Sequence, residues 1–251
     1  MAFTSVESLL RAAEDHPLWE AVLLDDLRDR GVDRAASLEK MTALWAAMKA
    51  SVTGYDPSRR SACDLTGGAA ARVEAARVEL CGPVLTQVIA TALKVAECNA
   101  CMGRIVAAPT AGASGVLPAV LLPMQEKYGH PDGEMVQALY VSAGFGQVIA
   151  TRASISGAEG GCQAEVGSAS AMAAAALVSL MGGAPEQMAH ACAAALQNLM
   201  GLVCDPVAGL VEVPCVKRNV IGAVNALTAA EMALAGVTCA IPCDEVIDAM
   251  R

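Results

Sequence analysis

Positive charge and aromatic side chains are both scarce in this sequence. Its 251 residues hold 17 Lys and Arg against 26 Asp and Glu, a formal net charge of -9, and only two Trp, three Tyr and two Phe. Nucleic acids need a basic protein surface for their phosphates, so this composition argues against a nucleic-acid partner. Membrane proteins place Trp and Tyr in belts at the lipid interface, and few are present for that role. We therefore expect neither nucleic acid nor a membrane as partner.

Uncharged stretches are nevertheless long, because 55% of the residues are hydrophobic. Residues 105–125 and 166–185 each approach the length that spans a bilayer. The first stretch contains Pro109, Pro118 and Pro123, which argue against a single lipid-facing helix. The second consists mainly of Ala and Ser, and helices packed closely in a large core explain it better than a membrane span does.

Alternating runs of β-branched residues and repeats at a fixed period are also missing, so strands are not expected. Apolar residues recur at helical spacing, and the expected fold is all-α, one large helical domain with glycine-rich loops. Thr4 and Glu7 predict a capping box, and Pro17 and Gly31 predict the start and end of the second helix. Residues 53–68 are predicted as a long loop. Further helices are predicted over residues 69–80, 84–101, 133–151, 168–182, 186–201 and 218–235.

Charged residues are denser in residues 1–104 than in residues 105–251. We expect a single domain over residues 1–251, in which residues 1–52 form peripheral amphipathic helices and residues 53–251 form the functional core. The first fifteen residues carry acids early and show no basic segment followed by an apolar one. No secretory signal is predicted, and the cytoplasm is the expected location.

Ten cysteines in a reducing compartment indicate metal binding, redox chemistry or buried thiols before they indicate disulfides. In the stretch CDPVAGLVEVPC, a continuous helix would separate Cys204 and Cys215 by roughly 16 Å, too far to share one small metal centre. Pro206 and Pro214 block such a helix, and Gly209 permits a turn. If the two sulfurs share a partner, the chain must double back between them.

Glycine-rich loops contain the other candidate binding residues. The segment APTAGASGVLPAV combines Thr110, Gly112 and Ser114, whose backbone N–H groups and hydroxyls can face a carboxylate or phosphate. An ordinary turn between two core helices is the alternative explanation.

A second glycine-rich segment, ASISGAEGGCQAEVG, surrounds Cys162 with Ser154, Ser156 and several glycines. Glycine lets the backbone approach a bulky inorganic group closely. Elsewhere Cys98 and Cys101 form a C-x-x-C, but no second pair follows at zinc-finger spacing, so a structural zinc site is not expected.

Several ordered motifs together resemble the alpha chain of iron-sulfur-dependent L-serine dehydratase. They are GRIVAAPTAGASGVLPAVL, SISGAEGGCQAEVG, CDPVAGLVEVPCVKRNVIGAVNA and IPCDEVIDAM, with DLTGG at residues 64–68 and the N-terminal helices, so the resemblance covers essentially the whole chain. In that family three cysteines hold a 4Fe-4S cluster, and they match Cys162, Cys204 and Cys215. The resemblance implies L-serine as substrate, pyruvate and ammonia as products, and a beta chain as partner in a hetero-oligomer.

A cluster with three thiolate ligands, instead of four, keeps one iron open to act as a Lewis acid on the substrate hydroxyl and carboxylate. The residues we predict to bind the amino acid are Thr110, Gly112, Ser114, Ser154, Ser156, Arg218 and Asn219. Arg218 is the candidate carboxylate clamp, with Asn219 assisting it. The side chains predicted to shield the cluster from water are Val203, Val207, Leu210, Val211, Val213 and Val216.

The general base is not assigned within this chain. His16, His130 and His190 are its three histidines, and a structural role is the commoner explanation for each. The resemblance implies that the proton-abstracting histidine belongs to the beta region, which is a separate chain in the two-chain type. We therefore expect full activity to need the beta chain.

Other functions stay open at this point. An iron-sulfur L-cysteine desulfidase would use the same open iron on a thiol leaving group, and a cluster-based redox sensor or electron carrier would not act on serine. Pyridoxal phosphate is not expected as a cofactor, because no lysine lies in a Ser/Gly-rich motif suited to a Schiff base. A cluster with an open iron is also expected to be oxygen-sensitive.

Overall fold

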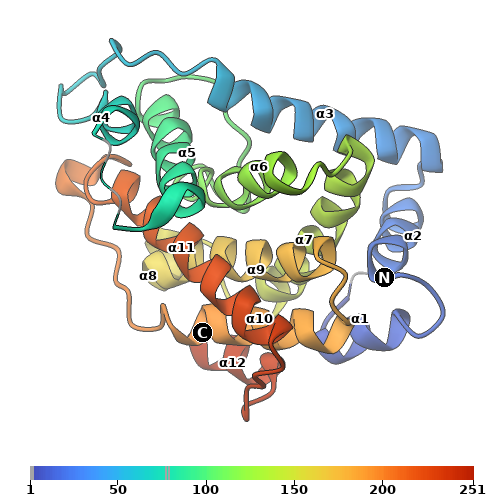
Figure 1. Ribbon diagram of the computed structural model, residues 1–251. Coiled ribbons are helices and arrows are strands. Elements are labelled where there is room, and N and C mark those ends of the chain that lie inside the picture. The colour runs from blue at the N-terminus through green and yellow to red at the C-terminus, as the bar shows by residue number, and fades with distance from the viewer. Residues whose placement is uncertain (1–2, 77, 79) are drawn as a thin grey trace.

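The computed structural model describes residues 3–76, 78 and 80–251, and every regular element in this part of the chain is helical. The predicted all-α fold is therefore confirmed (Figure 1). The helices are α1 (Val6–Ala12), α2 (Leu18–Arg30), α3 (Arg34–Thr53), α4 (Ala69–Ala75), α5 (Gly82–Ala100), α6 (Val116–Tyr128), α7 (Asp132–Arg152), α8 (Gly157–Cys162), the π-helix η1 (Gln163–Gly167), α9 (Ser168–Leu180), α10 (Pro185–Gln197), the 3-10 helix η2 (Val207–Gly209), α11 (Cys215–Leu234) and α12 (Cys243–Met250).

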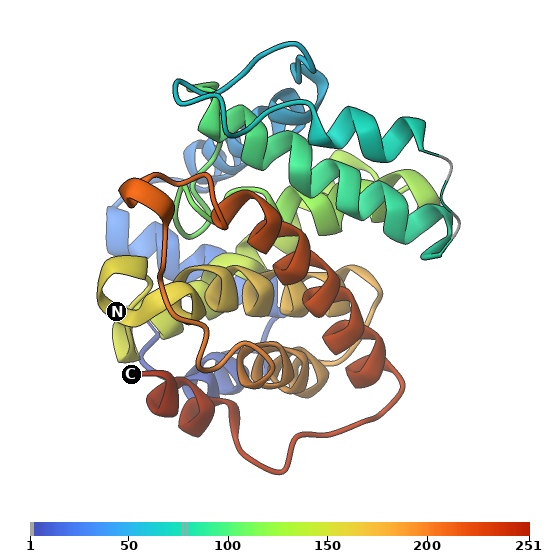
Figure 2. The ribbon, with the colours of Figure 1, turned by 90° about the vertical axis from the view of Figure 1, so that its left-hand side faces the viewer.

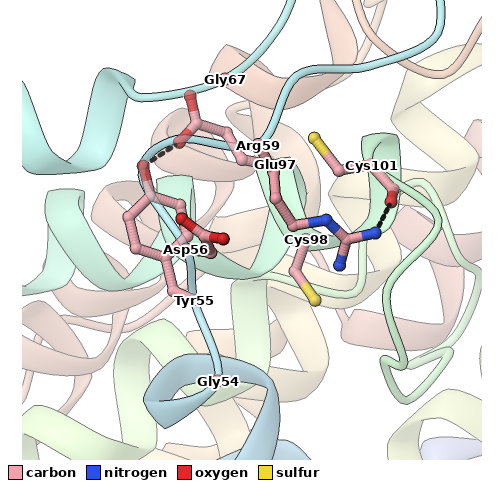
Figure 3. A pocket seen from close by; sticks show the side chains of 8 residues that line it. All are labelled: Gly54, Tyr55, Asp56, Arg59, Gly67, Glu97, Cys98 and Cys101. Carbon is pink, nitrogen blue, oxygen red and sulfur yellow. Dashed lines mark hydrogen bonds between the residues drawn. The ribbon is translucent and has the colours of Figure 1, made fainter.

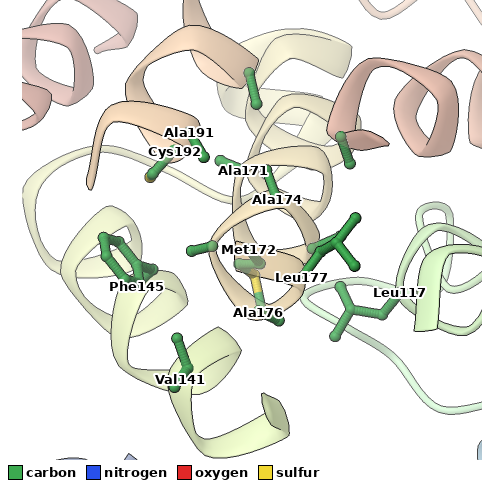
Figure 4. Close-up of a cluster of buried hydrophobic side chains, with 14 of the residues drawn as sticks. Leu117, Val141, Phe145, Ala171, Met172, Ala174, Ala176, Leu177, Ala191 and Cys192 are labelled. Carbon is green, nitrogen blue, oxygen red and sulfur yellow. The ribbon is translucent and has the colours of Figure 1, made fainter. Parts of the chain in front are cut away.

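Helix α9 lies at the centre of the fold, and its residues from Ser168 to Val178 are all buried. Helices α6, α7, α10 and α11 pack around it. Figure 4 shows Phe145 of α7 and Leu117 of α6 approaching α9 from opposite sides. Its alanines have the highest helix propensity and the smallest apolar side chains, so the helix is stable and its neighbours can come close. Within the described residues, no helix is both long enough and apolar enough to span a bilayer.

The N-terminal helices α2 and α3 pack against α7. Trp45 of α3 is fully buried, and its Nε1 donates a hydrogen bond to Asp132 Oδ1 at 3.0 Å. Lys49, one turn further along α3, forms an ion pair with the other carboxylate oxygen of Asp132 at 2.6 Å. These contacts hold the start of α7 against α3. The predicted division into peripheral helices over residues 1–52 and a functional core over residues 53–251 stays a prediction.

The end of the molecule that matters for function is formed by segments far apart in the sequence. Figure 2 shows the orange segment between α10 and α11 running beside the yellow α8. The backbone N–H of Gln163 donates to the carbonyl of Leu202 at 2.9 Å and joins the two segments. Gly161 has φ 79° there, and a Cβ on it would lie 2.9 Å from the Leu202 oxygen. Glycine is therefore required where these two segments meet.

Helix α6 was not among the predicted helices, and its prolines argued only against a lipid-facing helix. Pro118 lies in the first turn, where its missing N–H has no intrahelical partner to lose. Pro123 lies inside the helix and removes one backbone hydrogen bond. Burial of almost the whole segment from Val116 to Met124 outweighs that loss. The short helices α8 and α12 were missed as well. Helix α4 ends at Ala75, short of the predicted residue 80, and residues 77 and 79 of that prediction lie outside the described part.

The capping box of α1 is shifted from the prediction by one residue. Ser5, not Thr4, is the N-cap, and its Oγ accepts a hydrogen bond from the N–H of Ser8 at 3.0 Å. The neighbouring N–H groups of the first turn donate to the carboxylate of Asp244, at 2.8 and 3.0 Å. Thr and Ser are both good N-cap residues. The N-cap is Ser5, and Asp244, near the C-terminus, also contacts the first turn.

We expect Gly144→Ala on α7 to destabilise the fold by about 1–3 kcal/mol. Its added Cβ would lie 2.6 Å from Cγ2 of Val22 on α2, a stiff β-branched side chain. Gly133→Ala on the same helix is the matched control, since nothing lies within 4 Å of that Cβ, and it is expected to be neutral or stabilising by up to about 1 kcal/mol. Urea unfolding measures both, and equal stabilities would contradict the close approach of α2 to α7.

Asp132→Asn is expected to lower the free energy of unfolding by about 1 kcal/mol at pH 7. The hydrogen bond from Lys49, followed by those from Gln125 and Trp45, lowers the pKa of Asp132 to about 2. Because the folded-state pKa is depressed, the stabilisation is present above the unfolded-state pKa of about 4 and is lost as the pH falls towards 2. The difference between wild type and variant, measured by urea unfolding, should be constant from pH 8 to 5 and smaller at pH 3.

Candidate metal centre

The three predicted cysteines come from three different elements. Cys162 is the last residue of α8, Cys215 is the first residue of α11, and Cys204 lies in the loop before α11. Burial is the main cause of the raised pKa of Cys162 and raises that of Cys215 to about 11. The charge of Cys204 adds to both shifts, and that of Cys162 adds to the shift of Cys215. Arg218 of α11 donates hydrogen bonds to Cys162 Sγ and to the carbonyl of Val203, which precedes Cys204. The structure therefore brings the segments that carry the three cysteines to one end of the molecule.

The chain doubles back between Cys204 and Cys215, as a shared partner for the two sulfurs would require. The N–H of Val207 donates to the carbonyl of Val213 at 2.8 Å, and η2 forms the turn between them. Gly209 has φ 72° in this turn, a left-handed conformation that glycine adopts without strain. Cys162 and Cys215 are buried, whereas Cys204 is exposed at the edge of the site.

Arg218, in the first turn of α11, ties this loop to α8. Its Nη1 donates to Cys162 Sγ and to the carbonyl of Val203, both at 3.0 Å, and lies 2.6 Å from Asp205 Oδ1. The hydrogen bond and charge of Arg218 oppose the effect of burial on the pKa of Cys162. Arg218 thus holds the cysteine loop in place, and its role as a clamp for the substrate carboxylate stays a prediction.

Asn219 is buried and holds the glycine-rich loop before α6. Its Oδ1 accepts a hydrogen bond from the N–H of Gly115 at 2.9 Å, and its Nδ2 donates to the carbonyls of Gly112 at 2.7 Å and Cys215 at 2.9 Å. Both amide protons are therefore used within the protein. The structure assigns Asn219 a positioning role, and its direct contact with substrate stays a prediction.

Two hydroxyls of the same loop have no protein partner. Thr110 Oγ1 and Ser114 Oγ are buried, and neither makes a hydrogen bond. A buried polar atom without a partner costs free energy unless a ligand or water satisfies it. Both residues were predicted to bind substrate, and their unused hydroxyls suit that role.

Ser154 and Ser156 are engaged within their own segment. Ser154 Oγ donates to Glu159 Oε2 at 2.7 Å and accepts from the N–H of Ser156 at 3.1 Å. Ser154 also lines a polar cleft of about 210 Å³ that reaches the C-terminal residues Met250 and Arg251. The structure places Ser154 at this cleft, and contact of either serine with substrate stays a prediction.

Most of the side chains predicted to shield the cluster are exposed in this chain, so their shielding role stays a prediction. Val216 is buried, but the other five side chains are exposed, namely Val203, Val207, Leu210, Val211 and Val213. The loop turns outward at η2, so its apolar side chains have no helix of this chain to pack against. Of the three candidate ligands, Cys162 and Cys215 are buried by the chain itself.

The C-x-x-C pair lies at a different place, at the end of α5. Cys98 and Cys101 line a cavity of about 10 Å³, and in Figure 3 their sulfurs point away from each other on either side of Arg59. Arg59 donates to the carbonyl of Cys101 at 2.8 Å. Burial, followed by the hydrogen bond to Glu97, raises the pKa of the neighbouring Tyr55 to about 12. These contacts anchor the 54–68 loop on α5.

Glu165 was not among the candidate site residues that the sequence indicated, although it lies close to the cysteines. It lies in the π-helix η1, three residues after Cys162, and its charge adds to the raised pKa of Cys162 and Cys215. The available signal was an acid inside the glycine-rich cysteine segment. Of the histidines, His130 contacts Glu134 and His190 contacts Cys239.

The residues present suit an iron-sulfur cluster. Within the described residues, no group of three or more His, Cys, Asp or Glu side chains is arranged to hold a single metal ion. Thiols are the donors that iron-sulfur clusters take, and the unpartnered hydroxyls of Thr110 and Ser114 provide polar atoms for a small ligand. A helical domain that joins three cysteine-bearing segments to the loop with these hydroxyls contains a candidate thiolate cluster site.

The chain belongs to the serine dehydratase alpha chain family, whose pattern matches residues 6–251. It is 57% identical over 189 residues to the "Probable L-serine dehydratase, alpha chain" of Bacillus subtilis (strain 168), covering 74% of this chain and 63% of that protein. It is 53% identical over 169 residues to the "L-serine dehydratase, alpha chain" of Peptoniphilus asaccharolyticus, covering 67% and 58%. The "L-serine dehydratase" of Streptomyces coelicolor (strain ATCC BAA-471 / A3(2) / M145) is 39% identical over 243 residues, covering 93% of this chain and 53% of that relative.

Asn219→Ala is expected to lower the free energy of unfolding by about 2–4 kcal/mol, because three backbone groups of the site lose a buried partner. Asn99→Ala is the matched control, since its Nδ2 donates to the carbonyl of Ala111 in the same loop but at the surface, and it should cost only about 0.5–1.5 kcal/mol. Hydrogen exchange should speed up at residues 112–115 in the first variant. Unchanged exchange there would contradict the positioning role.

Proposed function

We propose that this chain is the cluster- and substrate-binding part of a 4Fe-4S-dependent L-serine dehydratase, which converts L-serine to pyruvate and ammonia. The observation that supports it most is a set of contacts made by helix α11. Arg218 joins Cys162 to the loop that bears Cys204, and Asn219 joins Cys215 to the loop with the unpartnered hydroxyls of Thr110 and Ser114. The printed names of the relatives supply the substrate.

Cys162, Cys204 and Cys215 would hold the cluster, which when bound supplies an open iron as a Lewis acid for the substrate hydroxyl and carboxylate. Arg218 keeps the loop that bears Cys204 next to Cys162. Asn219 fixes the 112–115 loop on α11, so the hydroxyl of Ser114 in this loop and that of Thr110 just before it have a defined position for an amino acid. The burial of Cys162 and Cys215 limits access of water to their sulfurs.

Removal of the Cα proton is assigned to the proposed beta chain. His130 and His190 are engaged with Glu134 and Cys239, and His16 is exposed beside α2. A base must lie within hydrogen-bond reach of the proton that it removes. We therefore expect full turnover only from the hetero-oligomer.

The test is low-temperature EPR of the anaerobically reconstituted, dithionite-reduced chain with and without L-serine. Wild type is expected to give a 4Fe-4S signal that shifts when L-serine is added. Cys204→Ser should lose most of this signal, because a hydroxyl is a poor substitute for a thiolate ligand. Cys81→Ser, at an exposed thiol that precedes α5, is the matched control and should keep it.

The outcomes separate the proposal from its rivals. A signal that is present but does not respond to L-serine contradicts substrate binding by this chain and favours a carrier or sensor. A well-folded protein without any cluster overturns the proposal altogether. Exposure to air should abolish the wild-type signal.

A further inference from the structure

Glu165 is the one acid of the π-helix η1, between the helix that ends with Cys162 and the buried helix α9. A π-helix is a wider helical turn with hydrogen bonds between residues i and i+5, and it is found frequently at functional sites. It displaces side chains from the positions that a regular helix would give them. Here it places an acidic side chain on the side of the cysteines.

Two glycines make room for the carboxylate of Glu165. A Cβ on Gly112 would lie 3.2 Å from its Oε2 and 3.3 Å from its Oε1, and a Cβ on Gly157 would lie 2.5 Å from Oε2. The carboxylate therefore lies between the 112–115 loop and the start of α8. A side chain on either glycine would crowd it.

This carboxylate lacks a protein partner. Among the described residues, no side chain or backbone N–H donates a hydrogen bond to the carboxylate of Glu165, and no cation is paired with it. Arg218, the cation nearest the thiols, is paired with Asp205 instead. Glu165 is partly buried, and a partly buried carboxylate is best stabilised by a cation that hydrogen-bonds to it.

We propose that Glu165 binds the α-ammonium group of the amino-acid substrate and so selects amino acids over hydroxy acids that lack this group. The inference rests on the proposed function, because it places the substrate beside the thiols and the 112–115 loop. The ammonium group donates to the Glu165 carboxylate, and the Thr110 and Ser114 hydroxyls of the facing loop are available to the rest of the molecule. Glu165 acts through charge and position, and no proton transfer is assigned to it.

The experiment compares L-serine with 3-hydroxypropanoate, which keeps the carboxylate and β-hydroxyl but has no ammonium group. Isothermal titration calorimetry on the anaerobically reconstituted chain measures the Kd of each ligand. In Glu165→Gln, L-serine should bind about 10- to 100-fold more weakly, since one charge-assisted hydrogen bond is lost. Binding of 3-hydroxypropanoate should change by less than about threefold.

Two further variants test whether the effect depends on the position and charge of Glu165. Gly157→Ala keeps the charge but pushes the carboxylate aside, so it should reproduce the selective loss of L-serine binding. Glu39→Gln, at an exposed acid of α3, is the matched control and should change neither Kd. The EPR signal of each variant shows that the cluster is intact.

The results distinguish this inference from the proposed function. If Glu165→Gln weakens both ligands equally, or neither, Glu165 does not bind the ammonium group, while a serine-dependent EPR shift would still support the dehydratase. If wild type binds neither ligand, the proposed function itself fails and this inference fails with it. Selective loss of L-serine binding with an intact cluster confirms the inference.

Discussion

The architecture depends on how closely helices can approach the buried helix α9. Its small side chains let four neighbouring helices pack closely around it, and glycines on those neighbours allow a close approach at their own contacts. Gly222 of α11 is the case that matters most for function. A Cβ there would lie 2.7 Å from Cγ1 of Val166 in η1. This contact sets the distance between η1, which follows Cys162, and α11, which begins with Cys215.

On this scaffold the site is held by a small number of polar contacts. Asn219 fixes the loop that contains Thr110 and Ser114, and Arg218 fixes the loop that contains Cys204. Both residues lie in the first turns of α11, directly after Cys215. The rigid helix therefore carries one thiol and also positions two loops. The exposed apolar side chains of the cysteine loop take no part in these polar contacts, and the chain itself does not cover them.

Local sequence predicted most elements because they depend on near neighbours. Pro17 and Gly31 bound α2 as expected, and Gly209 forms the predicted turn between the cysteines. Prediction failed where contacts between residues distant in the sequence decide the local structure. Helix α6 forms in spite of Pro123 because its surroundings bury it, and the N-cap of α1 is Ser5 where the carboxylate of Asp244 approaches the first turn. The outward turn of the valine-rich loop likewise depends on packing that no local pattern reveals.

The sequence alone determined the helical fold, the family and which cysteines are candidate ligands, because periodicity, glycine and proline positions and ordered motifs are properties of neighbouring residues. The tertiary structure decided which hydrogen-bond partners the side chains of the site have. It engaged the amide of Asn219 and Nη1 of Arg218 in internal hydrogen bonds, and it left the hydroxyls of Thr110 and Ser114 without protein partners. It also placed the carboxylate of Glu165 between two glycines distant in the chain. Such contacts join segments that only the packing around α9 brings together. They could not be predicted from any single segment for this reason.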